Sequence, residues 1–268
     1  LPYSVFDLPL LDRWMLQRTA EVMDDITEAF ESFEFFRFFQ LLQNFCVTDL
    51  SNFYLDIAKD RLYVSAPADQ RRRSCQTVMA LIIERLAGLI APVLCHMAED
   101  IWQNLPYPVE ETSVFHRGWP TVPVEWRDAA LSAPVQELRE LRAAVNKVLE
   151  DCRGRQELGA SLEAAVRIDA RRPELQAALS WLSETGDPEV DGLRDWLLVS
   201  QLQIGGEPWA EVLASQDDEL ASIEVSRARG TKCERCWHYE GDVGQHPEHP
   251  HICGRCVGVL ERRTHQLA

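Results

Sequence analysis

Two closely spaced pairs of cysteines lie near the end of the chain and have the spacing of metal ligands. The pairs are Cys233-Glu-Arg-Cys236 and Cys253-Gly-Arg-Cys256, separated by 16 residues. In each pair a tight backbone turn directs both sulfurs to one centre, so the two pairs supply four thiolates in a tetrahedral set. This donor set suits Zn²⁺ and leaves no coordination position open. The sequence therefore predicts one structural Zn²⁺ held by Cys233, Cys236, Cys253 and Cys256, and no catalytic metal.

Other chemistries of these cysteines fit the chain less well. A disulfide framework is typical of small secreted domains, and a redox dithiol needs a single CxxC in a strand–helix unit. Histidines compete as zinc ligands, and His251 lies two residues before Cys253, so a Cys₃His site stays open as an alternative. The other competing histidines are His238, His246 and His249.

The first cysteine pair has a cationic and an aromatic neighbour. Arg235 lies inside the pair, and Trp237 follows it directly. Proteins bind single-stranded bases by stacking them on aromatic rings and by contacting their phosphates. Alternatively, Trp237 covers the zinc cluster as a miniature core, and composition alone does not favour the binding role over this one.

The elements before the cysteine pairs are expected to be mainly helical. Apolar residues recur at three- and four-residue spacing from Leu8 to about Leu105, which predicts long helices and an antiparallel bundle. We expect one helix around Leu11–Phe30, a second over 33–59, a third capped by Asp69 and a fourth from Pro92. Residues 106–128, rich in Pro and Trp, are expected to form an irregular strap.

The pattern changes after residue 132. An apolar stripe from Val135 to Leu149 predicts a helix, and alternation over 161–169 predicts a strand. Another helix is expected after Pro173, with further strands at 197–204 and 223–226 and a turn at Gly205-Gly206. The predicted architecture is mainly α. It comprises a helical bundle over 1–128, a mixed α/β junction domain over 129–226 and a zinc module over 227–268 that cannot fold by core packing alone.

The charge of the chain is uneven. The formal net charge is −16, which taken over the whole chain argues against a nucleic-acid partner. Residues 226–268 differ, with 7 basic and 5 acidic side chains. No apolar run approaches the roughly 18 residues of a membrane span, and the first residues lack a signal-peptide pattern. We therefore expect a cytoplasmic protein with no membrane partner.

Several stretches together resemble the bacterial isoleucyl-tRNA synthetase family. Lys232-Cys-Glu-Arg-Cys-Trp-His-Tyr and Ile252-Cys-Gly-Arg-Cys resemble its zinc-binding tail. Leu11-Asp-Arg-Trp14 is similar to the opening of a helix of its anticodon-binding bundle. Further similar stretches are Ser51–Asp56, Lys59-Asp-Arg61, Arg72–Thr77 and Leu158–Ala164. The resemblance covers nearly the whole chain.

This resemblance implies a fold and partners. The expected fold is the class I synthetase anticodon-binding bundle, a junction domain and the zinc tail, and the expected partners are the anticodon stem-loop of isoleucine tRNA and the remainder of the synthetase chain. Arg235 and Trp237 match tail positions that contact anticodon bases, whereas Arg72 and Arg73 match a basic patch for backbone phosphates or form a solvated helix start. We expect a monomer.

The chain also departs from the family pattern. The His-x-Gly-His and Lys-Met-Ser-Lys-Ser signatures of the ATP-binding catalytic core are absent, so we expect no catalytic residues here and ATP only in that missing core. The chain is interpreted as the C-terminal part of a longer aminoacyl-tRNA ligase, inactive alone.

Two other classes of protein could contain such a zinc module. A DNA-repair glycosylase has a similar zinc finger but needs an N-terminal Pro-Glu pair, whereas here Pro2 is followed by Tyr3. A free-standing zinc-stabilised module that binds protein or nucleic acid, without synthetase activity, stays open as the alternative.

Overall fold

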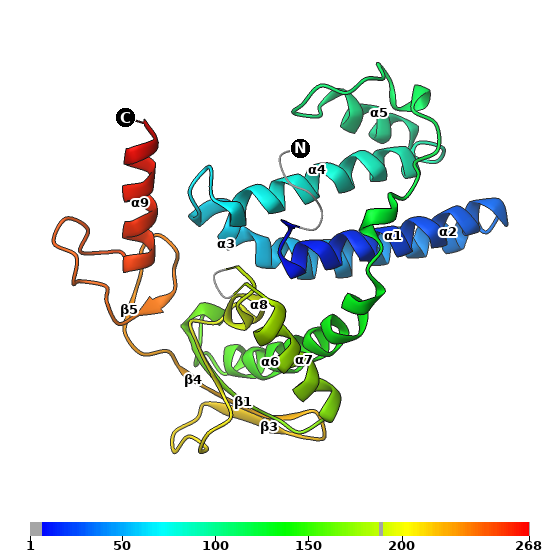
Figure 1. Ribbon diagram of the computed structural model, residues 1–268. Coiled ribbons are helices and arrows are strands. Elements are labelled where there is room, and N and C mark those ends of the chain that lie inside the picture. The colour runs from blue at the N-terminus through cyan, green and yellow to red at the C-terminus, as the bar shows by residue number, and fades with distance from the viewer. Residues whose placement is uncertain (1–6, 188–189, 268) are drawn as a thin grey trace. The chain divides into compact units, whose positions relative to one another are not determined.

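The chain folds into two compact units. The computed structural model describes residues 7–187 and 190–267, and of residues 263–267 it describes the backbone alone (Figure 1). Pro2 and Tyr3, on which the comparison with the glycosylases depends, lie outside the described residues. The first unit comprises Leu1–Asp56 and Arg73–Ala129, and the second comprises Ile57–Arg72 and Ala130–Ala268. The three-part division at 128 and 226 stays a prediction, and the grouping of 57–72 with the later residues was not foreseen.

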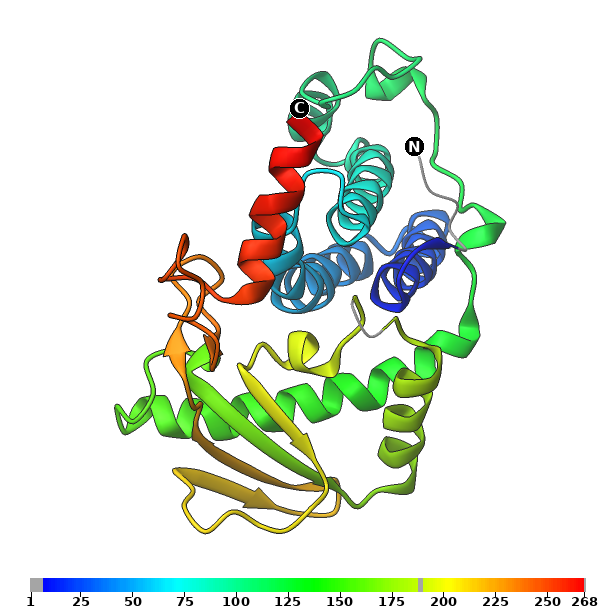
Figure 2. The same cartoon turned by 60° about the vertical axis from the view of Figure 1, so that its left-hand side comes forward.

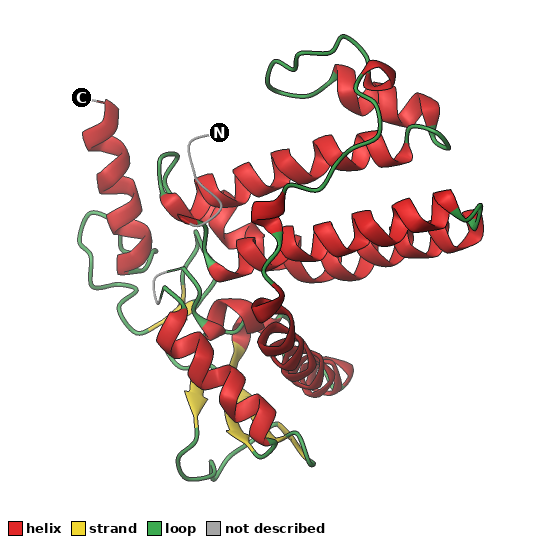
Figure 3. Ribbon diagram, turned by 45° about the vertical axis from the view of Figure 1, so that its right-hand side comes forward, coloured by secondary structure: helices red, strands yellow, loops and turns green. Residues whose placement is uncertain are grey.

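The first unit is helical, as its apolar spacing predicts. Helix α1 packs against α2 and the π-helical segment η2 that continues it, so the two rods run antiparallel (Figure 3). The ring of Trp14 meets that of Phe53 edge-on at 5.2 Å between centroids, inside an apolar core. The helices are α1 (Leu10–Glu31), α2 (Phe35–Asn44), η2 (Phe45–Leu55), α4 (Gln70–Ile90) and α5 (Cys95–Gln103).

The predicted irregular strap is confirmed. Between Gln103 and Ala129 the described chain has only the short 3₁₀ turns η3 (Val114–His116) and η4 (Val124–Trp126). Trp126 is buried beneath the guanidinium of Arg85, which lies 5.7 Å from the ring centroid. The strap therefore closes one side of the first unit's core.

The α3–α4 turn follows the predicted capping. Helix α3 (Asp56–Val64) continues η2, so the second predicted helix extends beyond residue 59. Helix α4 then starts where Asp69 Oδ1 accepts a hydrogen bond from the backbone N–H of Arg71 at 2.9 Å. A side-chain oxygen at this position satisfies an N–H that has no partner within the helix, which confirms Asp69 as the cap.

A four-stranded sheet forms the second unit's core, in the order β2-β1-β4-β3. Strand β1 is parallel to β2 and antiparallel to β4, and β4 is antiparallel to β3. The β1–β2 connection contains α7 and α8, as a parallel pair requires a crossover. Helix α7 begins at Pro173, as expected. The elements are α6 (Ser132–Gly154), β1 (Ala164–Ala170), α7 (Pro173–Thr185), α8 (Leu193–Leu197), β2 (Gln201–Ile204), β3 (Ala214–Asp217) and β4 (Ala221–Arg227).

One face of this sheet is apolar and the other is polar. Val166, Ile168, Ile223 and Val225 pack with the apolar side of α6, which lies along the sheet in Figure 2. Because side chains alternate along a strand, the intervening positions, such as Arg167 and Glu224, lie on the opposite face. Helix α8 and strand β3 were not predicted, since each is short and lacks a clear period.

The zinc module contains more regular structure than its composition suggested. A two-stranded sheet joins β5 (Thr231–Lys232) to β6 (Tyr239–Glu240), and α9 (Gly254–Leu267) begins inside the second cysteine pair. Within the described part of the chain, no helix is both long and apolar enough to cross a membrane.

Candidate zinc centre and the residues around it

The four paired cysteines converge on one point. Their sulfurs all lie within 4.8 Å of one another and all four residues are buried. Cys233 Sγ is 3.8 Å from Cys256 Sγ, and Cys236 Sγ is 3.7 Å from Cys253 Sγ. Zn–S bonds of about 2.3 Å place the sulfurs of a tetrahedron roughly 3.8 Å apart. The donor set therefore fits a single zinc ion.

The thiols of the cluster share hydrogen bonds that shift their pKa values in opposite directions. Hydrogen bonds with Cys253 and Cys256, together with the nearby Arg255 guanidinium, lower the pKa of Cys236, whereas hydrogen bonds with Cys236 raise the pKa values of Cys253 and Cys256. A thiolate is the form that binds a metal ion. His251 lies outside the cluster, because its side chain is exposed and its Nδ1 is 3.9 Å from Glu234 Oε1. Among the residues that the structure describes, the ligand group contains no histidine.

The cysteines have a small apolar core, and Trp237 is not part of it. Val64 of α3 is buried against the cysteines, with Val243 and Ile252 packed beside them. Trp237 is 61% exposed and has a left-handed backbone with φ of +68°. Lys232 Nζ lies 5.6 Å from the centroid of its ring. The indole therefore extends from the first cysteine pair toward solvent instead of covering the sulfurs.

Arg235 has partners within the chain. Its NH2 donates a hydrogen bond to the backbone carbonyl of Val64 at 2.6 Å, and its NH1 lies 3.5 Å from Cys256 Sγ. The side chain is half-buried, so it joins the first cysteine pair to α3. Its contact with tRNA stays a prediction.

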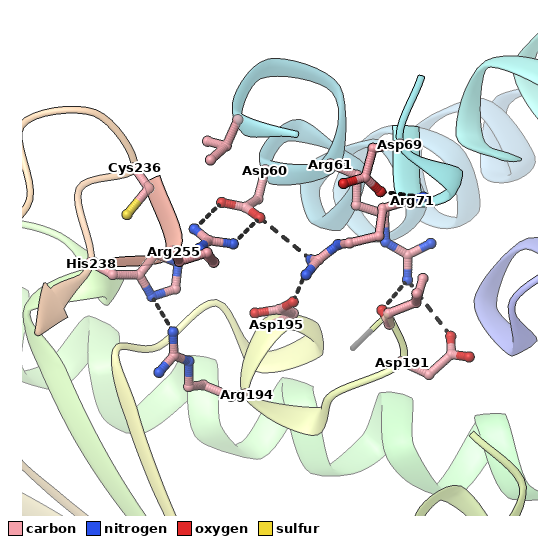
Figure 4. A network of polar contacts seen from close by, with 12 residues as sticks. Asp60, Arg61, Asp69, Arg71, Asp191, Arg194, Asp195, Cys236, His238 and Arg255 are labelled. Atoms are coloured by element: carbon pink, nitrogen blue, oxygen red, sulfur yellow. Dashed lines mark hydrogen bonds and ion pairs between the residues drawn. The ribbon is translucent and has the colours of Figure 1, made fainter. Parts of the chain in front are cut away.

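Arg255, inside the second cysteine pair, makes the other connection to α3 (Figure 4). Its NH1 and NH2 donate hydrogen bonds to Asp60 Oδ2 and Oδ1 at 2.7 and 2.8 Å. Burial alone would raise the pKa of Asp60, but the hydrogen bonds and charge of Arg255, with the charge of Arg71, hold it below its usual value. Asp60 is thus an ionised, largely buried partner of the zinc module.

Further ion pairs extend this network to α8. Arg71 NH2 lies 2.6 Å from Asp195 Oδ2 and 3.5 Å from Asp60 Oδ2. Arg194 donates to Glu240 Oε1 at 2.8 Å and lies 3.4 Å from His238 Nδ1. Burial and the neighbouring Arg194 and Arg255 lower the pKa of His238. Apart from the Lys59-Asp-Arg61 stretch, no sequence pattern indicated these contacts.

Arg72 and Arg73, which were predicted to contact backbone phosphates from the start of a helix, differ in exposure. Arg73 is exposed, and its NH1 donates to Gln76 Oε1 at 3.2 Å. Arg72 is half-buried, and its backbone N–H donates to the carbonyl of Asp69 at 3.1 Å. Contact of Arg72 and Arg73 with backbone phosphates stays a prediction.

Comparisons with known proteins agree with this architecture. Residues 12–168 match the family model described as "Anticodon-binding domain of tRNA ligase", and residues 230–258 match "Zinc finger found in FPG and IleRS". An isoleucine–tRNA ligase of Parasynechococcus marenigrum (strain WH8102) is 89% identical over 264 residues, covering 98% of this chain and 27% of the relative. Isoleucine–tRNA ligases of Synechococcus sp. (strain CC9311) and Prochlorococcus marinus (strain MIT 9313) are 77% and 75% identical, over 97% and 96% of this chain and 27% and 26% of the relatives.

The chain spans about a quarter of the length of these relatives. The first family model covers more than half of the chain, and it includes the helices of the first unit and the start of the junction sheet. The second model contains all four clustered cysteines, which makes zinc the metal of this centre. The chain belongs to the anticodon-binding domain family of tRNA ligases.

Proposed function

We propose that this chain is the tRNA-binding part of an isoleucine–tRNA ligase and that it recognises the anticodon stem-loop of isoleucine tRNA. The family match and the high identity to isoleucine–tRNA ligases support this assignment. ATP-dependent aminoacylation then belongs to a catalytic core outside this sequence, which contains neither nucleotide-binding signature. The working form is a monomer in the cytoplasm, where thiols stay reduced for metal binding.

The proposed zinc site holds one ion through Cys233, Cys236, Cys253 and Cys256. Four thiolates complete a tetrahedron, so the ion stabilises the fold and offers no position to a substrate. The small core of Val64, Val243 and Ile252 is too small to stabilise the fold of the module, so the free energy of metal binding supplies the remaining stabilisation. The ion thereby fixes the backbone that carries Trp237.

The exposed indole of Trp237 is the observation that carries the recognition role. Anticodon bases are read when unstacked, and an aromatic plane replaces the stacking that they lose. The zinc centre holds the backbone of Trp237 in place, so little ordering entropy is lost on binding. Lys232 beside the ring adds a positive charge for the adjacent phosphate. Arg235, Arg72 and Arg73 are the further proposed contacts.

A titration of labelled isoleucine tRNA against the zinc-loaded chain tests this function. Trp237→Ala should weaken binding by about 1–3 kcal/mol, the usual range for one stacked base. Arg171→Ala is the matched control, because Arg171 is exposed but paired with Asp217 at 2.5 Å. Equal affinity of Trp237→Ala and wild type, with zinc content confirmed, would contradict the proposed role of Trp237. Absence of tRNA binding by the wild type would contradict the function.

A further inference from the structure

The arginines of the second unit differ in whether they have a carboxylate partner among the described residues. Arg171, Arg172 and Arg194 each form an ion pair. Arg227 and Arg229 are exposed, and their guanidinium groups make no hydrogen bond or ion pair with another described residue. In a chain of net charge −16, such arginines are available to an anionic ligand.

Both arginines line a pocket of about 890 Å³ at the edge of the junction sheet where β2 begins and β4 ends. Ala165 and Ser226 are short residues that also line it, together with Gln201, Gln203 and Trp209. Ala165 pairs with Gln201 on one side and with Ser226 on the other. The short side chains of Ala165 and Ser226, near the ends of β1 and β4, therefore leave room beside Gln201.

The loop that bounds this pocket is anchored to the sheet. The backbone N–H of Trp209 donates to Glu224 Oε2 at 2.9 Å, and its Nε1 donates to Gln203 Oε1 at 3.1 Å. Glu224 in turn pairs with the buried Arg167 at 3.2 Å. The indole is half-buried and lines the pocket from a fixed position.

The backbone that carries the arginines is also fixed. Gln201 donates to the carbonyl of Arg229 at 2.8 Å and accepts from its N–H at 3.0 Å. Gly230 has φ of +99°, and a Cβ there would lie 2.5 Å from the carbonyl oxygen of Glu240. The connection from β4 to the zinc module is therefore held against both β2 and β6.

The composition of the pocket selects among anionic ligands. Glu207 and Glu211 line it as well, and their carboxylates repel a free phosphate but accept hydrogen bonds from amino and imino groups. A ligand with a phosphate, a planar ring and N–H donors fits all of these groups. A nucleotide has these features, and phosphate contacts with arginine together with base stacking are the usual means of holding single strands.

We propose that this pocket binds one nucleotide of single-stranded RNA, with Arg227 and Arg229 on its backbone phosphates and Trp209 beside its base. The proposal rests on the function proposed above and extends the RNA-binding surface from Trp237 onto the junction sheet. Lys232 and Trp237 follow the arginines along the same connection.

The test compares two double variants of the zinc-loaded chain. Arg227→Ala/Arg229→Ala removes the proposed phosphate contacts. Arg155→Ala/Arg171→Ala is the matched control, since it removes equal charge from exposed arginines that are paired with Glu157 and Asp217. Each is titrated with a labelled anticodon stem-loop of isoleucine tRNA, and with a blunt duplex of the same stem, at several salt concentrations.

The pocket variant should bind the stem-loop about tenfold more weakly than wild type, and the slope of log K against log salt should fall by roughly 1 to 2. The control should stay within about twofold. An unchanged affinity and slope in the pocket variant overturns the proposal. An equal loss on the blunt duplex also overturns it, because the contacts would then lie on the stem.

A second pair of measurements separates this proposal from the function on which it rests. If Trp237→Ala weakens binding but Arg227→Ala/Arg229→Ala does not, the proposed function stands and the nucleotide pocket is rejected. If the wild type fails to bind the stem-loop, both are rejected. Circular dichroism and zinc content of each variant exclude misfolding as the cause of a loss.

Discussion

Arg255 and Asp60 form a two-hydrogen-bond ion pair, at 2.7 and 2.8 Å, between the second zinc-binding turn and helix α3. The residues are 195 positions apart in the chain. With Arg235 bound to the carbonyl of Val64, this pair makes both cysteine turns part of the second unit's packed structure.

Loss of the Asp60 carboxylate should destabilise the zinc module. Asp60→Asn removes one charge but keeps the size of the side chain, and it should lower the free energy of unfolding of the second unit by about 1.5–3 kcal/mol, the range for hydrogen bonds to charged groups. Chemical denaturation of the zinc-loaded chain measures the loss. Asp217→Asn, which breaks an exposed pair, should cost less than about 1 kcal/mol.

The pH dependence of that loss has a definite sign. Arg255 holds the pKa of Asp60 below its ordinary value, so the contribution of the carboxylate is present above the unfolded pKa of about 3.9 and is lost as pH falls through the folded pKa. The difference between wild type and Asp60→Asn should therefore be constant from about pH 6 to about pH 8. A difference that changes across this range would mean that another group accounts for it.

Chelation of zinc should unfold the module and spare most helices. Among the described residues, the apolar members of the cysteine cluster are Val64, Val243 and Ile252, whereas α1, η2 and α6 have extensive buried faces. A strong chelator should therefore abolish the protection of amides over 231–256 in hydrogen exchange, while most far-ultraviolet helical signal remains. Loss of the whole helical signal would show that the zinc centre is required for both units.

The ligand set has a direct test at His251. Cys256→Ser should lose zinc, because Cys256 is buried within the sulfur cluster. His251→Ala should retain one zinc ion per chain, because the histidine side chain is exposed. Metal analysis after dialysis measures both. Loss of zinc from His251→Ala with retention in Cys256→Ser would establish the Cys₃His alternative.

The chain alone should form no aminoacyl-adenylate. Neither His-x-Gly-His nor Lys-Met-Ser-Lys-Ser, the signatures that the family resemblance implies for an ATP-binding core, occurs in the sequence. Isoleucine-dependent pyrophosphate exchange measures the activity, with an intact isoleucine–tRNA ligase as the positive control. Exchange above background by the purified chain would reveal a nucleotide site outside those signatures.

Local signals in the sequence were enough to predict several elements. The spacing of the cysteines predicted the clustered sulfurs of Cys233, Cys236, Cys253 and Cys256. Each pair directs its own two sulfurs to one point within a short turn, so two pairs complete a set of four ligands. Apolar periodicity predicted α1 and α6, and Asp69 predicted the start of α4, because each signal spans only a few residues.

The contacts between the zinc module and helix α3 became visible in the folded chain alone. Asp60 and Val64 contact residues of the module that are far along the chain, and no periodicity encodes a pairing over such a distance. The placement of Trp237 was also open in the sequence, because the surrounding residues were compatible both with an indole that covers the zinc cluster and with an exposed indole. Its exposure follows from Val64, Val243 and Ile252, which occupy the apolar space around the cysteines and leave the indole outside it.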